Sequence, residues 1–302
     1  MSKRVVLFGA SGTIGKAVAK ELLRCGYEIV CALRSTSDVP DDLSGCKIRS
    51  GALVDVFGTE KFDVAISCIA SRTGVPEDAW AVDYQANSDI LKAAQTHDVR
   101  HFILVSAICV QKPKLAFQHA KLAFEKELIE SGLTYSIVRP TAFFKSLSGQ
   151  VERVRSGKPY LLFSNGELTR CKPISDSDLA RYIVGCIDDP ARHDRMLPIG
   201  GPGPAITPLE QGEELFRLTG CKPRYRRVPI VLMNAIIGAL SLVGLVSKRA
   251  AAKAEYAKIG RYYATESMLV WDEKQRRYDA DATPEFGRET LFDYYEELVR
   301  AS

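Results

Sequence analysis

The chain has little of the residue types that build metal or disulfide sites. It holds four histidines and eight cysteines in 302 residues, and no two cysteines form a C-x-x-C pair. Without such pairs or a His/Cys cluster of ligand spacing, the sequence predicts no zinc site, no iron–sulfur cluster and no other bound metal. Most cysteines stand in apolar segments, as small buried thiols do. We therefore expect reduced thiols and a cytoplasmic location.

Strong charge of one sign is also absent. Lys and Arg total 41 against 37 Asp and Glu, and a net charge of +4 is too small to indicate a nucleic-acid partner. Hydrophobic residues make up 46% of the chain, which is ordinary globular usage. The apolar run at the N-terminus is too short for a signal peptide, because Lys3-Arg4 leads directly into a strand-like Val5-Val6-Leu7-Phe8.

Short apolar runs alternate with helical patterns through the first half of the chain. The patterns predict strands at 5–8, 28–33, 47–49, 62–69, 101–107 and 134–138, and helices at 16–25, 83–97 and 115–130. Such alternation indicates an α/β fold, a doubly wound parallel sheet of the Rossmann type. The rhythm changes after Arg139-Pro140. We expect a Rossmann domain over 1–150 and a smaller, mixed, substrate-covering C-terminal lobe over 151–302.

A glycine-rich turn follows the first predicted strand and opens the first helix. Gly9 permits a tight turn, Gly12 lets a pyrophosphate approach the backbone, and Gly15 lets the helix pack on the strand. Exposed amides and the helix N-terminus then attract the anion, which makes residues 9–15 a dinucleotide-binding site. The seven residues are Gly9, Ala10, Ser11, Gly12, Thr13, Ile14 and Gly15. A structural turn without a ligand is the alternative.

The second strand ends at Leu33 and is followed by Arg34 and Ser35. An acidic residue usually stands there when the cofactor is NAD, whereas a guanidinium matches the charge and shape of a 2′-phosphate. The sequence therefore predicts NADPH, with an exposed arginine at a strand end as the alternative. Cys68 and Ser106 end two further strands at the same carboxyl edge, where the nicotinamide should lie.

The G-x-x-G-x-x-G spacing resembles that of the extended and atypical short-chain dehydrogenases/reductases. That superfamily normally carries Tyr-x-x-x-Lys, and this chain has Phe117 and Lys121 at the two positions. The resemblance implies that Lys121 hydrogen-bonds the nicotinamide ribose. A phenyl ring cannot exchange a proton with an alcohol or carbonyl oxygen. Either the domain senses NADPH without chemistry, or it reduces a bond whose electrons do not end on oxygen.

Several longer runs resemble one family much more specifically, the NADPH-dependent divinyl chlorophyllide 8-vinyl reductases of (bacterio)chlorophyll synthesis. The resemblance covers nearly the full length and implies transfer of hydride from NADPH to the 8-vinyl group of a divinyl chlorophyllide or protochlorophyllide, giving 8-ethyl. The runs that carry it are FILVSAICVQKP at 102–113, FQHAKLAFEKEL at 117–128, YSIVRPTAFFKSL at 135–147, CKPISD at 171–176, IGGPGP at 199–204 and GRYYATESML at 260–269.

The resemblance also suggests where a large, flat pigment would bind. Aromatic side chains could form the pocket walls and cations could meet the propionate edge. The candidates are Phe143, Phe144, Tyr262, Lys172 and Arg261, with His119 as a magnesium ligand or proton source. The alternative for the aromatic residues is ordinary core packing, and for His119 a surface helix position.

Residues 228–246 form a long apolar stretch with basic residues on both sides. Three interpretations stay open: a helix buried in the core or in a pocket wall, an interfacial helix held against anionic lipid, and a membrane span at the lower limit of length. An interfacial helix would place the enzyme peripherally at photosynthetic membranes. Pro229, Gly238 and Gly244 make it a poor isolated span.

Three rival functions remain at this stage. One is a non-catalytic NADPH sensor, like the nitrogen-metabolite-repression regulators, which share this domain and also lack the tyrosine. The second is an atypical reductase of another conjugated alkene, of the isoflavone-reductase type. The third is a structural or assembly role on a membrane complex.

Overall fold

The computed structural model describes residues 3–34, 39–40 and 43–301. The chain divides into two compact units, each built from two stretches of sequence. Unit 1 comprises Met1–Pro140 and Asp176–Pro198, and unit 2 comprises Thr141–Ser175 and Ile199–Ser302. The expected single boundary after residue 150 therefore differs from the observed division, because the chain leaves unit 1, returns to it and leaves again.

Unit 1 is built on a seven-stranded sheet in the order β3-β2-β1-β4-β5-β6-β8. Every pair from β3 to β6 is parallel. The order reverses at β1, where the chain first winds toward β3 and then crosses to β4. The predicted doubly wound α/β fold is thereby confirmed. The strands are β1 Arg4–Phe8, β2 Glu28–Leu33, β3 Lys47–Ser50, β4 Val64–Ser67, β5 His101–Val105, β6 Thr134–Pro140 and β8 Arg195–Ile199.

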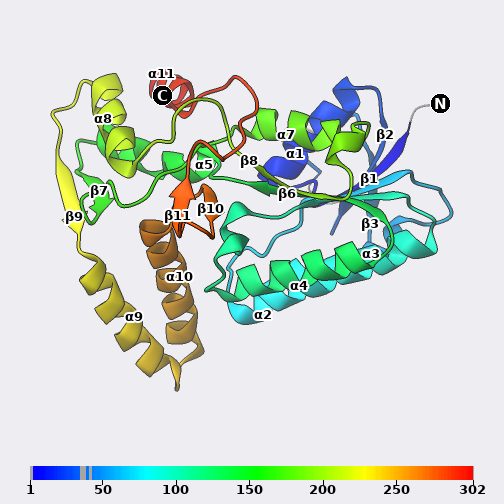
Figure 1. The fold of residues 1–302 in the computed structure, drawn as a ribbon, viewed down its shortest axis with the longest axis horizontal. Coiled ribbons are helices and arrows are strands. Elements are labelled where there is room, and N and C mark those ends of the chain that lie inside the picture. The colour runs from blue at the N-terminus through cyan, green and yellow to red at the C-terminus, as the bar shows by residue number, and fades with distance from the viewer. Residues whose placement is uncertain (1–2, 35–38, 41–42, 302) are drawn as a thin grey trace. The chain divides into compact units, whose positions relative to one another are not determined.

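Helices cover both faces of this sheet (Figure 1). Helices α1 (Thr13–Arg24) and α7 (Asp176–Gly185) pack together on one face. Helices α3 (Asn87–Thr96) and α4 (Ala116–Glu130) lie on the other, preceded by the short α2 (Pro76–Ala79) and a π-helical stretch at Trp80–Ala86. Alternate strand residues face the α3–α4 side and join one core cluster, because side chains point to opposite faces with period two. Examples are Val6, Phe8, Phe102 and Leu104, which share this cluster with Phe124 of α4.

The return of the chain at residue 176 completes unit 1. Helix α7 packs on α1, and β8 adds the last strand beside β6. These two elements stand after the Arg139-Pro140 change of rhythm, where the sequence pattern predicts only the lobe. Because α7 packs on α1 and β8 pairs with β6, the two units are not separated by a single boundary in the sequence.

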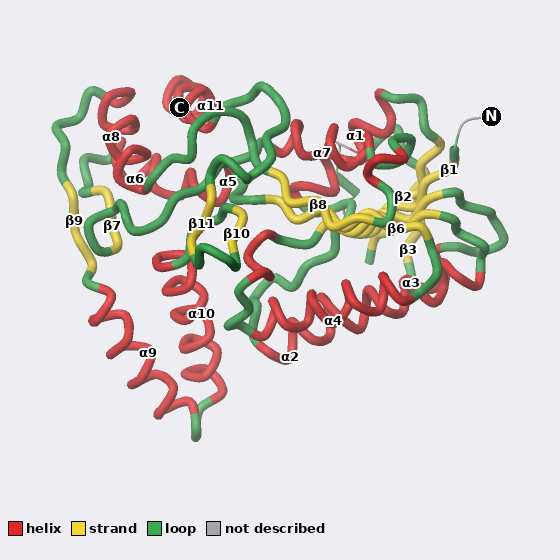
Figure 2. Tube along the Cα trace, viewed as in Figure 1, coloured by secondary structure: helices red, strands yellow, loops and turns green. Residues whose placement is uncertain are grey.

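Unit 2 mixes short strands and helices around its own core, as Figure 2 shows by element type. Tyr295 is fully buried at its centre, and its hydroxyl donates to the Leu147 carbonyl at 2.9 Å. The elements are α5 Phe144–Leu147, α6 Val151–Arg155, β7 Tyr160–Phe163, α8 Pro208–Thr219, β9 Tyr225–Val228, α9 Ile230–Gly244, α10 Lys248–Thr265, β10 Val270–Asp272, β11 Arg277–Asp279 and α11 Leu291–Arg300.

Helix α9 makes up most of the long apolar stretch and pairs with α10 in a helical hairpin. Within unit 2 the hairpin extends away from α8 and α11 (Figure 1). The whole of α9 is described and none of its residues is buried, so the interpretation as a core helix is wrong. Among the described residues no helix is long and apolar enough to cross a bilayer, and the interpretation as a span is not supported either.

One buried histidine makes the stability of unit 1 sensitive to pH. His101 opens β5, its Nε2 lies 2.9 Å from the Ser136 hydroxyl, and its ring meets that of His193 edge-on at 4.5 Å. Burial lowers the pKa of the His101 imidazole to about 4, and repulsion from His193 and Lys3 acts in the same direction. The folded protein therefore resists protonation that the unfolded chain accepts near pH 6.5.

We predict that this histidine makes the protein lose stability as the pH falls from 6.5 toward 4. The unfolded state binds the extra proton in this window, and the loss between pH 7.5 and 5 should be about 2 kcal/mol. Urea denaturation at the two pH values measures it. The variant His101→Gln keeps a hydrogen-bonding side chain that does not titrate. Its free energy of unfolding should therefore fall about 2 kcal/mol less than that of the wild type over the same pH range. An equal loss in both proteins would contradict the assignment.

Candidate active site

The loop after β1 has a geometry that only glycine tolerates at two positions. Gly9 has φ +80°, and a Cβ there would lie 2.8 Å from the carbonyl carbon and oxygen of Cys68. A Cβ on Gly15 would lie 2.1 Å from the Gly9 carbonyl oxygen. The loop is therefore clamped between α1 and the end of β4, as the sequence pattern predicts for a tight turn and close helix packing.

Gly12 differs, because the fold does not strictly require glycine there. Its φ of −77° is ordinary, and a Cβ would meet only the Gly9 oxygen, at 3.3 Å. Gly12 also caps α1 without a side-chain hydrogen bond, and the first turn of the helix contains no acidic residue. Ser11, Gly12 and Thr13 are exposed, whereas Ala10 is buried and Ile14 half-buried. An uncapped helix start behind an exposed, uncharged turn suits a phosphate anion.

The other predicted cofactor residues follow neighbouring strands at the same edge of the sheet. Arg34 is exposed directly after β2, and its charge is one of the smaller causes that lower the pKa of Asp78, after hydrogen bonds from Thr73. Cys68 contacts Gly9, and loss of water around its thiol raises the pKa of Cys68 to about 12. This thiol stays protonated at neutral pH and is not a nucleophile. Ser35 lies outside the described residues.

Lys121 is held in a buried ion pair. Its Nζ lies 2.9 Å from Oδ1 of Asp83, whose side chain is completely shielded from solvent. The same Oδ1 accepts a hydrogen bond of 3.3 Å from the Ser71 amide in the loop after β4, and Oδ2 has no hydrogen-bond partner among the described residues. Asp83 thus connects the lysine of α4 to the carboxyl edge of the sheet.

Asn87 supports this pair from the start of α3. The Ser67 hydroxyl at the end of β4 donates to Oδ1 of Asn87 at 2.5 Å. The Asn87 amide donates in turn to the carbonyls of Val82 and Asp83, each at 3.2 Å. The π-helical stretch that carries Asp83 is therefore tied to the strand, and such stretches are frequent at functional sites.

Ser106 is engaged as well. Its hydroxyl donates to the carboxylate of Glu125, which is buried and paired with Arg139 of β6. Glu125 stands one turn after Lys121 on α4, so the two charged side chains share a face of that helix. The serine hydroxyl therefore points to a carboxylate of the protein itself.

Phe117 and His119 lie on different sides of the same helix. Phe117 is half-buried and four residues before Lys121, and the i, i+4 spacing puts both on one face. His119 is exposed and two residues from the lysine, which turns it to the opposite side. The structure does not bring His119 next to Lys121. It therefore favours the interpretation of His119 as a surface helix residue.

Apart from His119 on α4, the predicted pigment-binding residues belong to unit 2. Phe144 and Tyr262 are buried, and Phe144 is part of the core of the unit, packed against Tyr294. Phe143 is half-buried, and its backbone pairs with Ile174. These placements favour packing for Phe144 and leave Phe143 as the more accessible aromatic side chain.

The two predicted cations already have partners within unit 2. Lys172 is buried and forms an ion pair with Glu285. The Arg261 guanidinium donates to Oδ1 of Asn234, which links α10 to α9. Either cation would have to share its partner or exchange it in order to bind a carboxylate.

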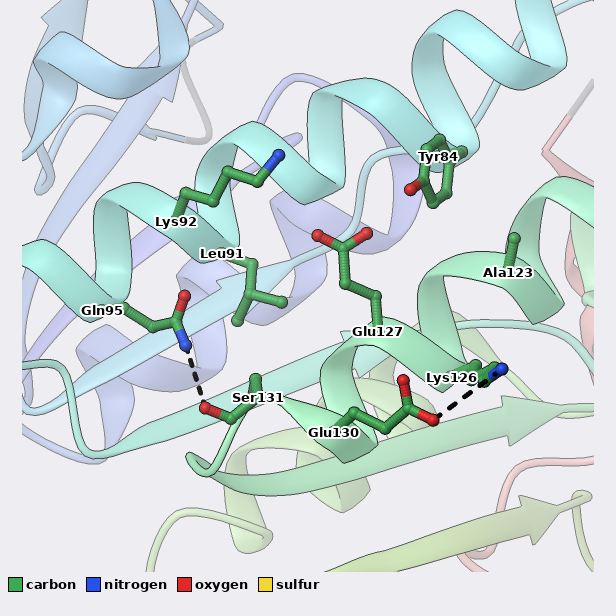
Figure 3. A pocket seen from close by; sticks show the side chains of 9 residues that line it. All are labelled: Tyr84, Leu91, Lys92, Gln95, Ala123, Lys126, Glu127, Glu130 and Ser131. Atoms are coloured by element: carbon green, nitrogen blue, oxygen red, sulfur yellow. Dashed lines mark hydrogen bonds and ion pairs between the residues drawn. The ribbon is translucent and has the colours of Figure 1, made fainter.

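A surface groove of about 450 Å³ lies between α3 and α4 (Figure 3). The Gln95 amide donates across it to the Ser131 carbonyl at 2.9 Å, and Lys92, Lys126, Glu127 and Glu130 line it with both signs of charge. None of the predicted site residues is among its nine lining residues. This groove is separate from the glycine loop.

The sequence reasoning missed Asp83, Asn87 and Glu125. A partial signal for them exists, because these polar residues stand on helix faces that also carry the buried apolar residues. Asp83 and Asn87 are four residues apart, as are Lys121 and Glu125. Polar residues at such spacing on a buried face indicate that they have partners, although the spacing does not show which residues the partners are.

Comparison with known proteins defines the class first. Residues 9–190 match the NAD(P)H-binding family model. The chain also superimposes on an NADPH-dependent quinone oxidoreductase from Escherichia coli, crystallised with NADPH, with a TM-score of 0.70 and 16% identity over 97% of this chain and 99% of that one. The fold is that of the NAD(P)-binding Rossmann proteins.

Two curated relatives narrow the class further. The chain is 46% identical to the chloroplastic divinyl chlorophyllide a 8-vinyl-reductase of Cucumis sativus, over 98% of this chain and 76% of the relative. It is 47% identical to the enzyme of the same name from Oryza sativa subsp. indica, over 98% and 78%. The chain belongs to the divinyl chlorophyllide a 8-vinyl-reductase family, an oxidoreductase family, as the resemblance implied.

We predict that Asp83 acts on the cofactor through Lys121. Lys121→Ala should raise the dissociation constant for NADPH about tenfold, because the free energy of one charge-assisted hydrogen bond corresponds to a change of this size. Asp83→Asn should raise it less, and the double variant should bind no more weakly than Lys121→Ala alone. Titration of NADPH fluorescence measures all three. Additive effects of the two substitutions would show that Asp83 acts independently of the lysine.

Proposed function

We propose that this protein is a divinyl (proto)chlorophyllide 8-vinyl reductase that uses NADPH. The relatives named above carry this activity in their names. The observation in this chain that supports it most directly is Phe117, one turn before the buried Lys121. A vinyl group conjugated to a macrocycle takes up a hydride at its terminal carbon, and the negative charge spreads into the ring. No alkoxide forms, so the reaction needs no tyrosine at this position.

The residues of the glycine loop fit a dinucleotide. Ser11, Gly12 and Thr13 offer an exposed turn at the uncapped start of α1, and Gly12 leaves room for a phosphate. Arg34 supplies a guanidinium for the 2′-phosphate, which favours NADPH over NADH. Cys68, Ser106 and Lys121 follow along the carboxyl edge toward the nicotinamide end.

NADPH supplies the hydride, and the chain supplies binding and orientation. In this proposal Lys121, which forms an ion pair with Asp83, holds the ribose hydroxyls. Holding the two reacting groups in alignment lowers the barrier by as much as about 7–11 kcal/mol. The Ser106 hydroxyl donates a hydrogen bond to Glu125, so a weak acid such as water is the proton source for the inner vinyl carbon in this proposal.

The pigment-binding assignments stay proposals. Phe143 is the aromatic candidate best placed to contact a ring, and Lys172 and Arg261 are the candidates for the propionate. The expected location, cytoplasmic and at the periphery of photosynthetic membranes, also stays a prediction.

A spectrophotometric assay tests the function. Purified protein with NADPH and divinyl chlorophyllide should convert it to the monovinyl pigment, seen as a small blue shift of the Soret band, with one NADPH oxidised per pigment. Monovinyl chlorophyllide is the matched control and should leave NADPH unchanged. Binding of NADPH without any conversion would favour the sensor instead.

We predict that Arg34 sets the preference for NADPH. Arg34→Asp removes the guanidinium and adds a charge that repels a 2′-phosphate, so the dissociation constant for NADPH should rise at least tenfold. The constant for NADH should stay unchanged or fall. Lys20→Asp, an exposed position on α1, makes the same change in net charge and should move neither constant. An unchanged NADPH/NADH ratio in Arg34→Asp would refute the role of the arginine.

A further inference from the structure

The α9–α10 hairpin holds together through contacts between its two helices. The start of α10 comes so close to α9 that a Cβ on Gly244 would lie 3.1 Å from the Ala251 Cα. Arg261 near the end of α10 hydrogen-bonds Asn234 near the start of α9. The positions of α9 that are partly covered recur with helical period, at residues 230, 233, 237, 240, 241 and 244. One face of α9 is therefore used for packing.

The opposite face of α9 is both apolar and exposed. An amphipathic helix of a globular protein turns its polar side to solvent, and α9 turns aliphatic side chains there instead. The face continues into the turn before α10. Its most exposed side chains are Val231 (76% exposed), Leu242 (70%), Leu245 (82%) and Val246 (90%). An apolar surface of this kind marks a site of interaction.

Charge around this face has one sign. Between Lys222 and Lys253 the sequence contains seven Lys and Arg and no Asp or Glu. All seven are exposed, and they flank α9 at both ends: Lys222, Arg224, Arg226 and Arg227 before it, Lys248, Arg249 and Lys253 after it. The 15-residue helix between the two groups is about 22 Å long. Within the described residues no ion pair neutralises these seven cations.

We propose that the exposed face of α9 docks on a membrane surface rich in anionic lipid. The aliphatic face would enter the boundary between headgroups and acyl chains, with the helix parallel to the surface. The cations at both ends would then meet lipid phosphates at the same depth. This inference goes beyond the proposed reaction and does not depend on it.

Charge decides between a membrane and a second copy of the chain. Two copies that met through α9 would bring two sets of seven cations together, with no carboxylate between Lys222 and Lys253 to separate them. An anionic surface satisfies the aliphatic face and the cations at the same time. A helix that lies on the membrane also needs only one apolar face, which is what α9 offers once α10 covers the other.

Flotation with lipid vesicles tests the proposal on the full chain, without NADPH or pigment. The protein should float with vesicles of phosphatidylglycerol and phosphatidylcholine, much less with phosphatidylcholine alone, and less as salt rises. Leu242→Asn with Leu245→Asn should lower the partition coefficient at least tenfold. Replacing Arg226, Arg227, Lys248 and Arg249 by Gln should lower it about fivefold for each cation removed.

Matched controls separate docking from a general effect on the protein. Leu168→Asn removes an exposed leucine of unit 2 outside the hairpin, and Lys274→Gln with Arg276→Gln removes two exposed cations elsewhere in the unit. Both should float like the wild type. NADPH binding and circular dichroism should be unchanged in every variant, since all substituted positions are exposed.

Several results would overturn the proposal. One is no flotation with anionic vesicles. Another is flotation that the hairpin variants leave unchanged. A third is a dimer in solution that Leu242→Asn with Leu245→Asn dissociates, while vesicles bind neither form; this would assign the face to a second copy. If the wild type floats with anionic vesicles and both hairpin variants float less, docking is supported, whatever the reductase assay shows.

Discussion

Helix α1 lies against the loop after β1 so closely that position 15 has room for a hydrogen atom only. The Gly9 carbonyl oxygen would be 2.1 Å from a Cβ on Gly15, and Gly9 is itself pressed on Cys68 at the end of β4. These contacts fix the start of α1 above the point where the strand order reverses between β1 and β4. Open α/β sheets bind ligands at such a point, so the rest of the candidate site depends on this packing.

The charged groups around the sheet edge are placed at some expense of stability. Lys121 with Asp83 is a buried pair, and Arg139 with Glu125 pairs a half-buried guanidinium with a buried carboxylate. Pairs of this kind rarely stabilise more than well-packed apolar residues would. Breaking one of them leaves an unpaired buried charge, which costs about 3–5 kcal/mol. Each pair therefore holds its side chains in one arrangement, and this is what a site that works by orientation requires. Phe117, on the same helix as Lys121, has an apolar side chain that carries no exchangeable proton.

The sequence predicted the sheet and the glycine loop well, because both depend on local rules. Apolar runs of strand length, glycine at a positive φ and a helix that starts at once are visible within about twenty residues. It did not predict that α7 and β8 rejoin unit 1, since that depends on packing against α1 and β6, distant in the chain. Asp83 was missed for a related reason: its role follows from the partner it meets on α4, and no spacing within its own segment shows that partner.

The apolar stretch at 228–246 is a second case in which the sequence alone could not show the contacts of a segment. Hydropathy alone describes a helix that is apolar all round, which suits a core, an interface or a span equally. The structure resolves this by covering one face with α10 and leaving the other exposed. Side chains that are exposed in the folded state are also exposed in the unfolded chain, so their presence changes folding free energy little. The exposed face of α9 is therefore not explained by the stability of the fold. We propose that its explanation lies in what the surface contacts, and the cations at both ends of the helix favour an anionic partner.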